Sequence, residues 1–392
     1  MKKVLKTIII LLCILTVNTK AEELNIMSKN AILYNASEGE ILYEKNPKEK
    51  IQIASLTKIM TALITLENIE DLNKQVIITY EDLKNLTEQN LVTAGFTVGS
   101  IVTYKDLLYG LLLPSGADAA QALARNASYN FVEQMNNKAK ELNLENTNFT
   151  NPIGLDDENN YSTINDLLII FKEALKIDEF KKIITTKEYT TSDGKLTFKS
   201  TIRRNAAKYN IEVPYIEGGK TGTTDLAGLC LASIAKDENT NLILITAGAP
   251  YDKKSPHHIE DAKTIYDYFI SNYSEQKLVD KKISFKKLKT KYVKEDEIEI
   301  FPEKDITKYV STNFNKDDIK YKYTGKKIIK YNTKGTIGKV KIYYKDKLIS
   351  TQKVKINKKL KFSIKKYIET NIIKIIIVLT LILLVIIIKR VR

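Results

Sequence analysis

The stretch ASLTKIMTAL, residues 54–63, places Ser55 and Lys58 three positions apart at the start of an apolar helical pattern. Residues three apart on a helix share a face, so the lysine amine could accept the proton of the serine hydroxyl. A serine hydroxyl is a weak nucleophile at neutral pH and needs such a base. Serine is also a favoured first residue of a core helix, and this stretch alone does not separate the two roles.

Two later stretches add groups of the kind that acyl transfer uses. PSGADAA begins at Pro114, in a break between two helical patterns, and presents Ser115 on a turn. GGKTGTT begins at Gly218 and carries Lys220 into an apolar strand. Ser-x-x-Lys, Ser-Gly-x and Lys-Thr-Gly, in this order, form the signature of penicillin-binding proteins and class A β-lactamases. The ordered set favours Ser55 as a nucleophile.

The base in such a site must be the lysine, because histidine is scarce. The chain has 2 histidines, His257 and His258, which are adjacent in a polar segment. A Ser-His-Asp triad or a zinc peptidase is therefore not expected, and no metal or cofactor is implied. Lys58 can act as the base if its pKa is low. Burial, the positive charge of Lys220 and the helix N-terminus would all lower that pKa.

The other motif residues have expected roles in the same reaction. The backbone N–H groups of Ser55 and Thr223 would stabilise a tetrahedral oxyanion. Gly222 would let the substrate lie close against the strand, and Ser115 would relay a proton to the leaving amine. The residues expected to hold a substrate carboxylate are Lys220, Thr221 and, as a further candidate, Thr223.

These motifs and their surroundings resemble a known family. The stretches are AILYNASEGEILYEKNPKEKIQIASLTKIMTAL, YGLLLPSGADAA, NPIGLDDENNYST and GGKTGTTDLAG. They are similar to low-molecular-mass penicillin-binding proteins that act as D-alanyl-D-alanine carboxypeptidases. The resemblance covers about residues 27–273, and residues 275–360 resemble the small β domain that follows in that family. It implies that Ser55 attacks the D-Ala-D-Ala bond of peptidoglycan stem peptides, and that penicillin and other β-lactam antibiotics acylate the same serine.

Two departures from the family pattern affect the expected site. The family usually has asparagine at the third position of the second motif, where this chain has Ala117. The relay through Ser115 survives this change but the amide contact is lost, so we expect slower turnover or an altered substrate preference. Members often carry an arginine before the last helix, where this chain reads HHIED. Arg204 is the candidate for that carboxylate contact, with an ordinary surface charge as its alternative role.

Two other functions share part of this pattern. A β-lactamase needs a carboxylate that activates the deacylating water, but Glu158 is followed four residues later by Ser162 and not by the asparagine of a Glu-x-x-x-Asn motif. We therefore expect slow release of penicillin. A non-catalytic wall-binding protein would explain Ala117, but the retained Ser55 and Lys58 disfavour it.

The two ends of the chain read as export and anchoring segments. Residues 1–21 have lysines, an apolar run and small residues in the order of a secretory signal peptide. Residues 372–388 form an apolar run whose only charged residue is Lys374 and which basic residues follow, a pattern typical of a transmembrane helix with its tail inside the cell. The expected location is the cell membrane, crossed once, with the catalytic domain outside the cytoplasm.

The charge distribution predicts two domains between these ends. Residues 275–370 carry 28 lysines and 12 acidic residues, whereas residues 22–274 carry 26 basic and 35 acidic residues. We therefore expect a catalytic domain at 22–273 and a basic domain at 275–365. The lysines of the second domain could meet anionic lipid headgroups or anionic wall polymers. Nucleic acid is not an expected partner because the domain is exported.

The periodicities predict an α/β (α+β) catalytic domain. Residues 31–46 and 228–250 each read as a β-hairpin, and helical patterns cover 57–67, 104–112, 118–127 and 258–272. One antiparallel sheet assembled from both ends of the domain, with a helical insertion between, is the simplest architecture. The basic domain alternates apolar residues and lysines, as in residues 339–356, and is expected to be all-β.

Overall fold

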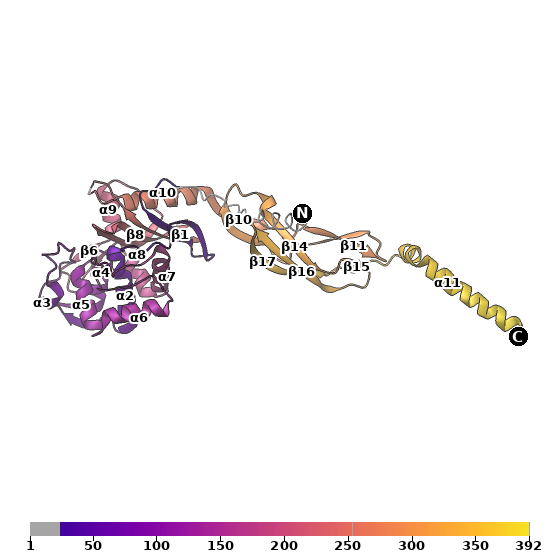
Figure 1. Cartoon of the computed structure of the whole chain (residues 1–392), viewed down its shortest axis with the longest axis horizontal. Helices are drawn as coiled ribbons and strands as arrows, with labels where there is room; N and C mark the ends of the chain where they lie inside the picture. Colours follow the sequence, from indigo (N-terminus) through magenta and orange to yellow (C-terminus); the bar gives the residue numbers. More distant parts are fainter. Residues whose placement is uncertain (1–23, 253, 392) are drawn as a thin grey trace, which may run out of the picture. The chain divides into compact units, whose positions relative to one another are not determined.

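The chain forms two compact units that divide between Ser271 and Asn272. The structure is a computed structural model that describes residues 24–252 and 254–391. Figure 1 shows the element labels that are used from here on. The predicted signal segment, residues 1–21, lies outside the described residues.

The first unit contains a five-stranded antiparallel sheet with the order β2-β1-β9-β8-β7. Its strands are β1 (Asn30–Asn35), β2 (Glu40–Lys45), β7 (Ile216–Thr224), β8 (Gly228–Asp237) and β9 (Thr240–Ala249). The register pairs Leu33 with Leu244 and Gly222 with Cys230. Both predicted hairpins are present, and the prediction of a sheet assembled from the two ends of the unit is correct.

Helices between β2 and β7 form the insertion. They are the 3₁₀ helix η1 (Ala54–Leu56), α2 (Thr57–Asn68), α3 (Tyr80–Leu83), α4 (Tyr104–Leu112), α5 (Ala117–Ala127), α6 (Phe131–Glu141), α7 (Ile164–Ala174), α8 (Asp178–Thr185) and α9 (Thr201–Lys208). Two small hairpins accompany them: β3 (Gln75–Ile77) with β4 (Ile101–Thr103), and β5 (Glu188–Thr190) with β6 (Thr197–Lys199). The predicted helices at 57–67, 104–112 and 118–127 match α2, α4 and α5 to within one residue at each end.

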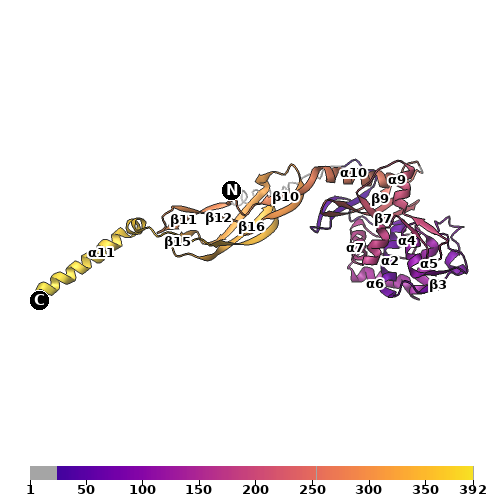
Figure 2. The same cartoon turned by 180° about the vertical axis from the view of Figure 1, so that it is seen from behind.

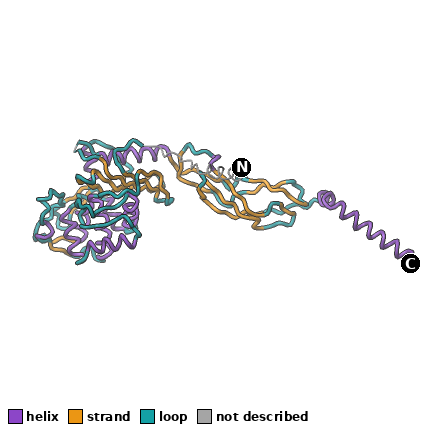
Figure 3. The backbone as a smooth tube through the Cα atoms, viewed as in Figure 1, coloured by secondary structure: helices purple, strands orange, loops and turns teal. Residues whose placement is uncertain are grey.

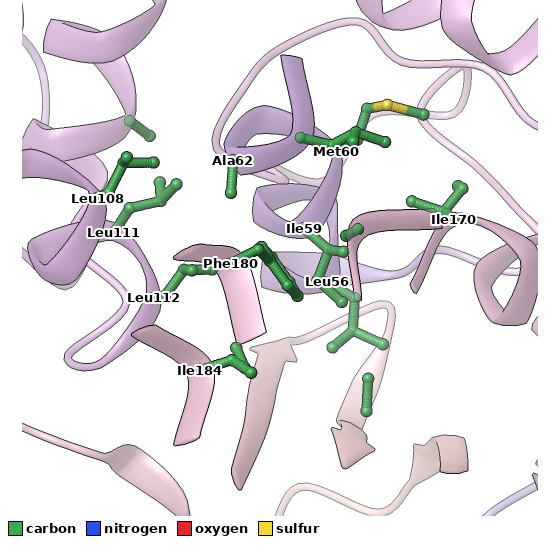
Figure 4. Close-up of a cluster of buried hydrophobic side chains, with 14 of the residues drawn as sticks. Leu56, Ile59, Met60, Ala62, Leu108, Leu111, Leu112, Ile170, Phe180 and Ile184 are labelled. Atoms are coloured by element: carbon green, nitrogen blue, oxygen red, sulfur yellow. The ribbon is translucent and has the colours of Figure 1, made fainter. Parts of the chain in front are cut away.

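Helix α2 is the central core helix of the insertion. Its residues from Thr57 to Thr65 are all buried. Figure 4 shows the apolar cluster that surrounds it, with side chains from α4, α7 and α8; the labelled residues are Leu56, Ile59, Met60, Ala62, Leu108, Leu111, Leu112, Ile170, Phe180 and Ile184. Each fully buried side chain of this size contributes about 1.5–3 kcal/mol to folding. The first turn of α2, which carries Lys58, is therefore held rigidly.

The opposite face of the sheet is covered by α10 (His257–Asn272), as Figures 1 and 2 show from the two sides. The Tyr266 hydroxyl lies 3.1 Å from the Ser233 hydroxyl of β8. The Asp261 carboxylate accepts hydrogen bonds from the backbone N–H of Met27 and of Ser28, at 2.8 and 2.7 Å. The sheet is thus packed between two helical layers, and the N-terminal segment is tied to α10.

The second unit is built mainly from strands, which Figure 3 colours orange. They are β10 (Tyr273–Val279), β11 (Lys286–Lys291), β12 (Glu297–Ile300), β13 (Ile306–Ser311), β14 (Ile319–Gly325), β15 (Ile328–Lys330), β16 (Gly335–Tyr344) and β17 (Lys347–Ile356), with a 3₁₀ turn η2 (Lys316–Asp318). In β16, Val340 and Ile342 face the core while Lys339 and Lys341, which alternate with them, are exposed. Lys345 and Asp346 turn the chain into β17 with φ angles of 45° and 62°.

The second unit ends in α11 (Ile364–Val391). Within the described part of the chain it is the one helix long and apolar enough to cross a membrane, over Ile364–Arg390. It begins eight residues before the apolar run at 372–388 that the sequence marks, because residues 364–371 continue the same helix.

Gly154 packs against the segment that carries Ser55, so a larger residue at this position should destabilise the fold. A methyl group on Gly154, where φ is +87°, would come within 1.9 Å of the Ala54 carbonyl oxygen. Backbone strain and overpacking together should make Gly154→Ala destabilising by about 3 kcal/mol, measured as the midpoint of urea unfolding. Gly194 is the matched control, since its φ is +74° but a methyl group there meets no described atom within 4 Å. Gly194→Ala should cost about 1 kcal/mol, and equal costs for the two variants would contradict the steric argument.

Candidate active site

Ser55 and Lys58 are held next to each other where η1 runs into α2. The Lys58 ammonium nitrogen Nζ lies 2.9 Å from the Ser55 hydroxyl oxygen Oγ and donates a second hydrogen bond to the Ile153 carbonyl oxygen at 2.6 Å. Ser55 is not a helix cap: the caps of η1 and α2 are Ile53 and Leu56, and neither helix has a side-chain cap. The alternative role of Ser55 that the sequence left open is therefore absent.

Burial sets the protonation state of Lys58. The residue is 1% exposed, and loss of hydration lowers the pKa of its ammonium group to about 7. The nearby Asp118 carboxylate acts in the opposite direction and raises that pKa, with a smaller effect. An amine with a pKa near neutrality is partly unprotonated at pH 7, so it can accept a proton.

Ser115 and Lys220 form a second serine and lysine pair. Lys220 Nζ lies 2.8 Å from Ser115 Oγ and also donates to the Thr221 carbonyl oxygen at 2.6 Å. Burial lowers the pKa of Lys220 well below its ordinary value, and the charges of Lys58 and Arg204 lower it further. The sequence predicts that repulsion between the two lysines lowers the pKa of Lys58; in the structure this repulsion acts on Lys220.

The backbone around the two serines is tightly packed and locally strained. Ala54 and Ser115 have φ angles of +46° and +72°, in the left-handed region that most residues avoid. A methyl group on Gly222 would lie 3.1 Å from the Ser55 backbone nitrogen and 3.1 Å from the Ala54 Cβ. The missing side chain of Gly222 thus makes room for the serine segment itself, in addition to any substrate.

A cleft of about 200 Å³ collects the sequence-predicted residues. Those that line it are Ser55, Lys58, Ser115, Ala117, Arg204, Thr221, Gly222 and Thr223. Lys220 is fully buried beside it and reaches Ser115 from below the surface. Arg204 is exposed on α9. The four motif stretches, far apart in sequence, therefore meet at one cleft.

Sequence reasoning assigned no role to several other residues of this cleft. Asn90, Leu91, Val92, Ile153, Gly154, Leu155, Thr201, Asn205 and Thr224 also line it. The Asn151 side chain shapes the segment that supplies the Ile153 carbonyl, because its oxygen accepts hydrogen bonds from three consecutive backbone N–H groups at 2.7–3.1 Å. The stretch NPIG, residues 151–154, is the sequence feature from which this role of Asn151 could have been predicted.

The described residues contain no cluster of three or more histidine, cysteine or carboxylate side chains that could hold a metal ion. This set of groups can perform acyl transfer through a serine: the hydroxyl first accepts the acyl group and then passes it on, with a lysine amine as the base.

Comparison with known proteins identifies the family. Residues 16–251 match the family model described as D-alanyl-D-alanine carboxypeptidase, peptidase family S11. The chain belongs to this family. The D-alanyl-D-alanine carboxypeptidase DacF of Bacillus subtilis is 32% identical over 337 residues, which cover 82% of this chain and 84% of that protein. The present protein is thus a serine-type carboxypeptidase, a hydrolase of the cell wall.

Solved structures share the fold of this carboxypeptidase. Penicillin binding protein 5 from Haemophilus influenzae is 25% identical and superimposes with a TM-score of 0.61, over 86% of this chain and 98% of that one. The Streptomyces K15 DD-transpeptidase is 31% identical with a TM-score of 0.56, over 62% of this chain and 97% of that one. The predicted fold class is therefore confirmed.

The pKa of Lys58 generates a pH prediction for the carboxypeptidase. Only the unprotonated amine can accept a proton, so the rate of acylation by penicillin should fall about tenfold per pH unit below pH 6, be half-maximal near pH 7 and level off above pH 8. Stopped-flow acylation between pH 5 and 9 measures this profile. In Lys220→Arg, whose guanidinium stays charged over this range, the remaining activity should keep the same acid limb. If Lys220→Arg shows no decrease in acylation rate at low pH, the decrease in the wild type reports protonation of Lys220 and not of Lys58.

Proposed function

We propose that this chain is a membrane-anchored D-alanyl-D-alanine carboxypeptidase that removes the terminal D-Ala of peptidoglycan stem peptides through an acyl-enzyme on Ser55. Penicillin and other β-lactams would acylate the same serine. The observation that carries the proposal is the 2.9 Å contact between Ser55 Oγ and a buried Lys58 amine at a cleft of about 200 Å³. Family membership supplies the substrate class.

The acylation step follows from these contacts. Lys58 takes the hydroxyl proton as Ser55 Oγ attacks the carbonyl carbon of the penultimate D-Ala. The backbone N–H groups of Ser55 and Thr223 stabilise the oxyanion of the tetrahedral intermediate. As the C–N bond breaks, the leaving amine of terminal D-Ala receives a proton from the Ser115 hydroxyl. The proton that Lys58 took from Ser55 replaces the one that Ser115 gives up, so Lys58 becomes neutral again and Lys220, to which Ser115 is hydrogen bonded, keeps its protonation state.

The carboxylate of terminal D-Ala needs cationic and hydroxyl donors at the end of the cleft. Lys220, Thr221 and Thr223 of β7 supply them, and Arg204 adds a charge from α9. The Thr221 hydroxyl donates to the Thr201 hydroxyl at 2.8 Å, which fixes its orientation. Substrate binding would bring a negative charge to Lys220 and raise its pKa, so that the bound state favours the protonated amine.

Hydrolysis of the acyl-enzyme completes the cycle: water attacks the ester carbonyl while the neutral Lys58 amine takes its proton, the acyl C–O bond breaks and Lys58 returns that proton to Ser55 Oγ. None of the described residues that line the cleft is a carboxylate. A β-lactamase needs such a group to activate the deacylating water, so this observation favours slow release of penicillin over β-lactamase activity.

Anchoring is supported by α11, and export by the pattern of residues 1–21. In this arrangement a single pass through the cell membrane leaves both compact units outside the cytoplasm, where the substrate is. The exposed lysines of the second unit would then face anionic lipid headgroups or anionic wall polymers.

Intact-mass measurement and D-Ala release test the assignment of Ser55. The full chain in detergent should form a lasting penicillin adduct and release D-Ala from a pentapeptide ending in D-Ala-D-Ala. Ser55→Ala should lose both reactions by more than about 10³-fold, whereas Ser37→Ala, in the exposed turn before β2, should change neither. An adduct on the Ser55→Ala variant would misassign the nucleophile. Rapid penicillin turnover by the wild type would instead indicate a β-lactamase.

A further inference from the structure

Four aromatic rings follow one another around the start of α11, and we call Tyr292, Tyr331, Phe362 and Tyr367 the aromatic cluster. The ring centroids of Tyr331 and Phe362 lie 4.8 Å apart, those of Phe362 and Tyr367 5.8 Å, and those of Tyr367 and Tyr292 4.9 Å. Tyr331, Phe362 and Tyr367 are nevertheless 43–44% exposed. The rings stabilise one another while presenting apolar surface outward.

Hydrogen bonds fasten this end of α11 to the β-strands of its own unit. The backbone N–H of Ser363 donates to the Tyr292 carbonyl oxygen at 3.0 Å, and the Asn371 side-chain amide donates to the Tyr292 hydroxyl at 3.1 Å. Lys366 Nζ donates to the Lys294 carbonyl oxygen at 2.7 Å. The first two turns of the helix are thus bound to the loop after β11.

The length of the apolar run places the aromatic cluster at the edge of a bilayer. Residues 372–388 span about 25 Å at about 1.5 Å per residue, which is less than the roughly 30 Å of a hydrocarbon core. Basic residues follow at the C-terminal end, so a bilayer that does not thin is spanned only if about one more turn at the N-terminal end, residues 368–371, enters its edge, where Glu369 lies 4.0 Å from Lys365. Ile364 and Ile368 there are 67% and 44% exposed.

Cationic side chains accompany the aromatic cluster. Lys291 Nζ lies 5.1 Å from the centroid of the Tyr292 ring. Lys365 has a side chain that is 85% exposed, and Lys366 pairs with Asp296 at 2.8 Å. Tyrosine rings lie preferentially at the boundary of acyl chains and headgroups, and lysine stems can extend from there to lipid phosphates.

We propose that the aromatic cluster rests in the headgroup layer of the bilayer that α11 spans, with the lysines on lipid phosphates. The second unit then stands directly on the membrane surface, held by the helix contacts described above. This inference depends on the proposed membrane anchoring and is independent of the chemistry at Ser55.

Tryptophan fluorescence can test the contact, because the chain has no tryptophan of its own. Phe362→Trp in the full-length protein, reconstituted in phosphatidylcholine and phosphatidylglycerol vesicles, should emit at shorter wavelength than in water. Lipids with a nitroxide near the headgroup should quench it about twofold or more. The matched control is Tyr321→Trp, a 37% exposed position on β14 of the same unit, which should not be quenched.

The outcomes separate the possible failures. If the protein floats with the vesicles but Phe362→Trp is quenched no more than Tyr321→Trp, the cluster does not contact lipid and the inference is wrong. A Phe362→Trp emission that is blue-shifted without lipid quenching would indicate that a second protein copy covers the rings, which also overturns it. A protein that does not float refutes the anchor together with this inference, while D-Ala release by the same sample tests the catalytic proposal separately.

A second observation concerns Asn90, which lies on the same cleft as Ala117. The loop from Asn90 to Phe96 is fixed against the Ser115 turn: the Ala117 N–H donates to the Val92 carbonyl oxygen at 2.8 Å, and the Asp118 carboxylate accepts from Ala94 N–H at 2.7 Å. Asn90 has a φ of +52°, its backbone N–H donates to the Thr87 carbonyl oxygen at 3.0 Å, and the residue is exposed where it lines the cleft.

From this placement we infer that the Asn90 amide contacts the bound stem peptide and supplies the amide that Ala117 lacks. The inference deepens the proposed carboxypeptidase function. It names a residue that binds substrate from a different loop, and it accounts for how a site without the usual asparagine can still hold the peptide.

A double-mutant cycle tests the role of Asn90. Asn90→Ala should lower kcat/KM for D-Ala release by about 10- to 100-fold, and Gln89→Ala, its exposed neighbour outside the cleft, should change it less than about threefold. In an Ala117→Asn background, the loss caused by Asn90→Ala should shrink to less than about threefold. Equal effects of Asn90→Ala and Gln89→Ala, or an undiminished loss in that background, would overturn the inference. Penicillin acylation of Ser55 reports independently on the proposed nucleophile.

Discussion

A lysine ammonium group loses its hydration when a protein core encloses it, and this cost governs the catalytic unit. Lys58 lies on α2, the helix that the apolar cluster surrounds, and burial lowers the pKa of its amine to about 7. The same packing holds that amine 2.9 Å from Ser55 Oγ and against the Ile153 carbonyl. A surface helix could carry the same two residues, but its lysine would remain charged and mobile.

The active site also requires that separate segments of the chain approach one another closely. Gly154 and Gly222 let two distant parts of the chain reach the short helix that carries Ser55: a methyl group would collide with backbone at Gly154 and make tight contacts at Gly222. Ala54 and Ser115 adopt left-handed backbone angles at the same place. Such conformations cost about 1–3 kcal/mol each. The core around α2 offsets that cost, so the strained turns can present both serines to one cleft.

The second unit follows a different physical rule. Its core is aliphatic and small, and the lysines that alternate with the core residues of β16 and β17 all point outward. This pattern specifies a β fold through local alternation and leaves a strongly basic surface. Near the start of α11, aromatic rings and hydrogen bonds join the lysines, a combination that suits a boundary between water and lipid.

The sequence by itself determined the order of the three motifs, the two hairpins of the catalytic sheet and the bounds of α4, because each depends on neighbours within a few residues. Residue type and spacing also predict Ser55, Lys58 and Ser115 as site residues, and the structure brings these three to one cleft. Only the tertiary structure decided that Ser55 is no helix cap, that the Ile153 carbonyl holds Lys58, and that Asn90 borders the cleft. These facts depend on burial and on contacts between segments tens of residues apart, and spacing along the chain carries no information about either.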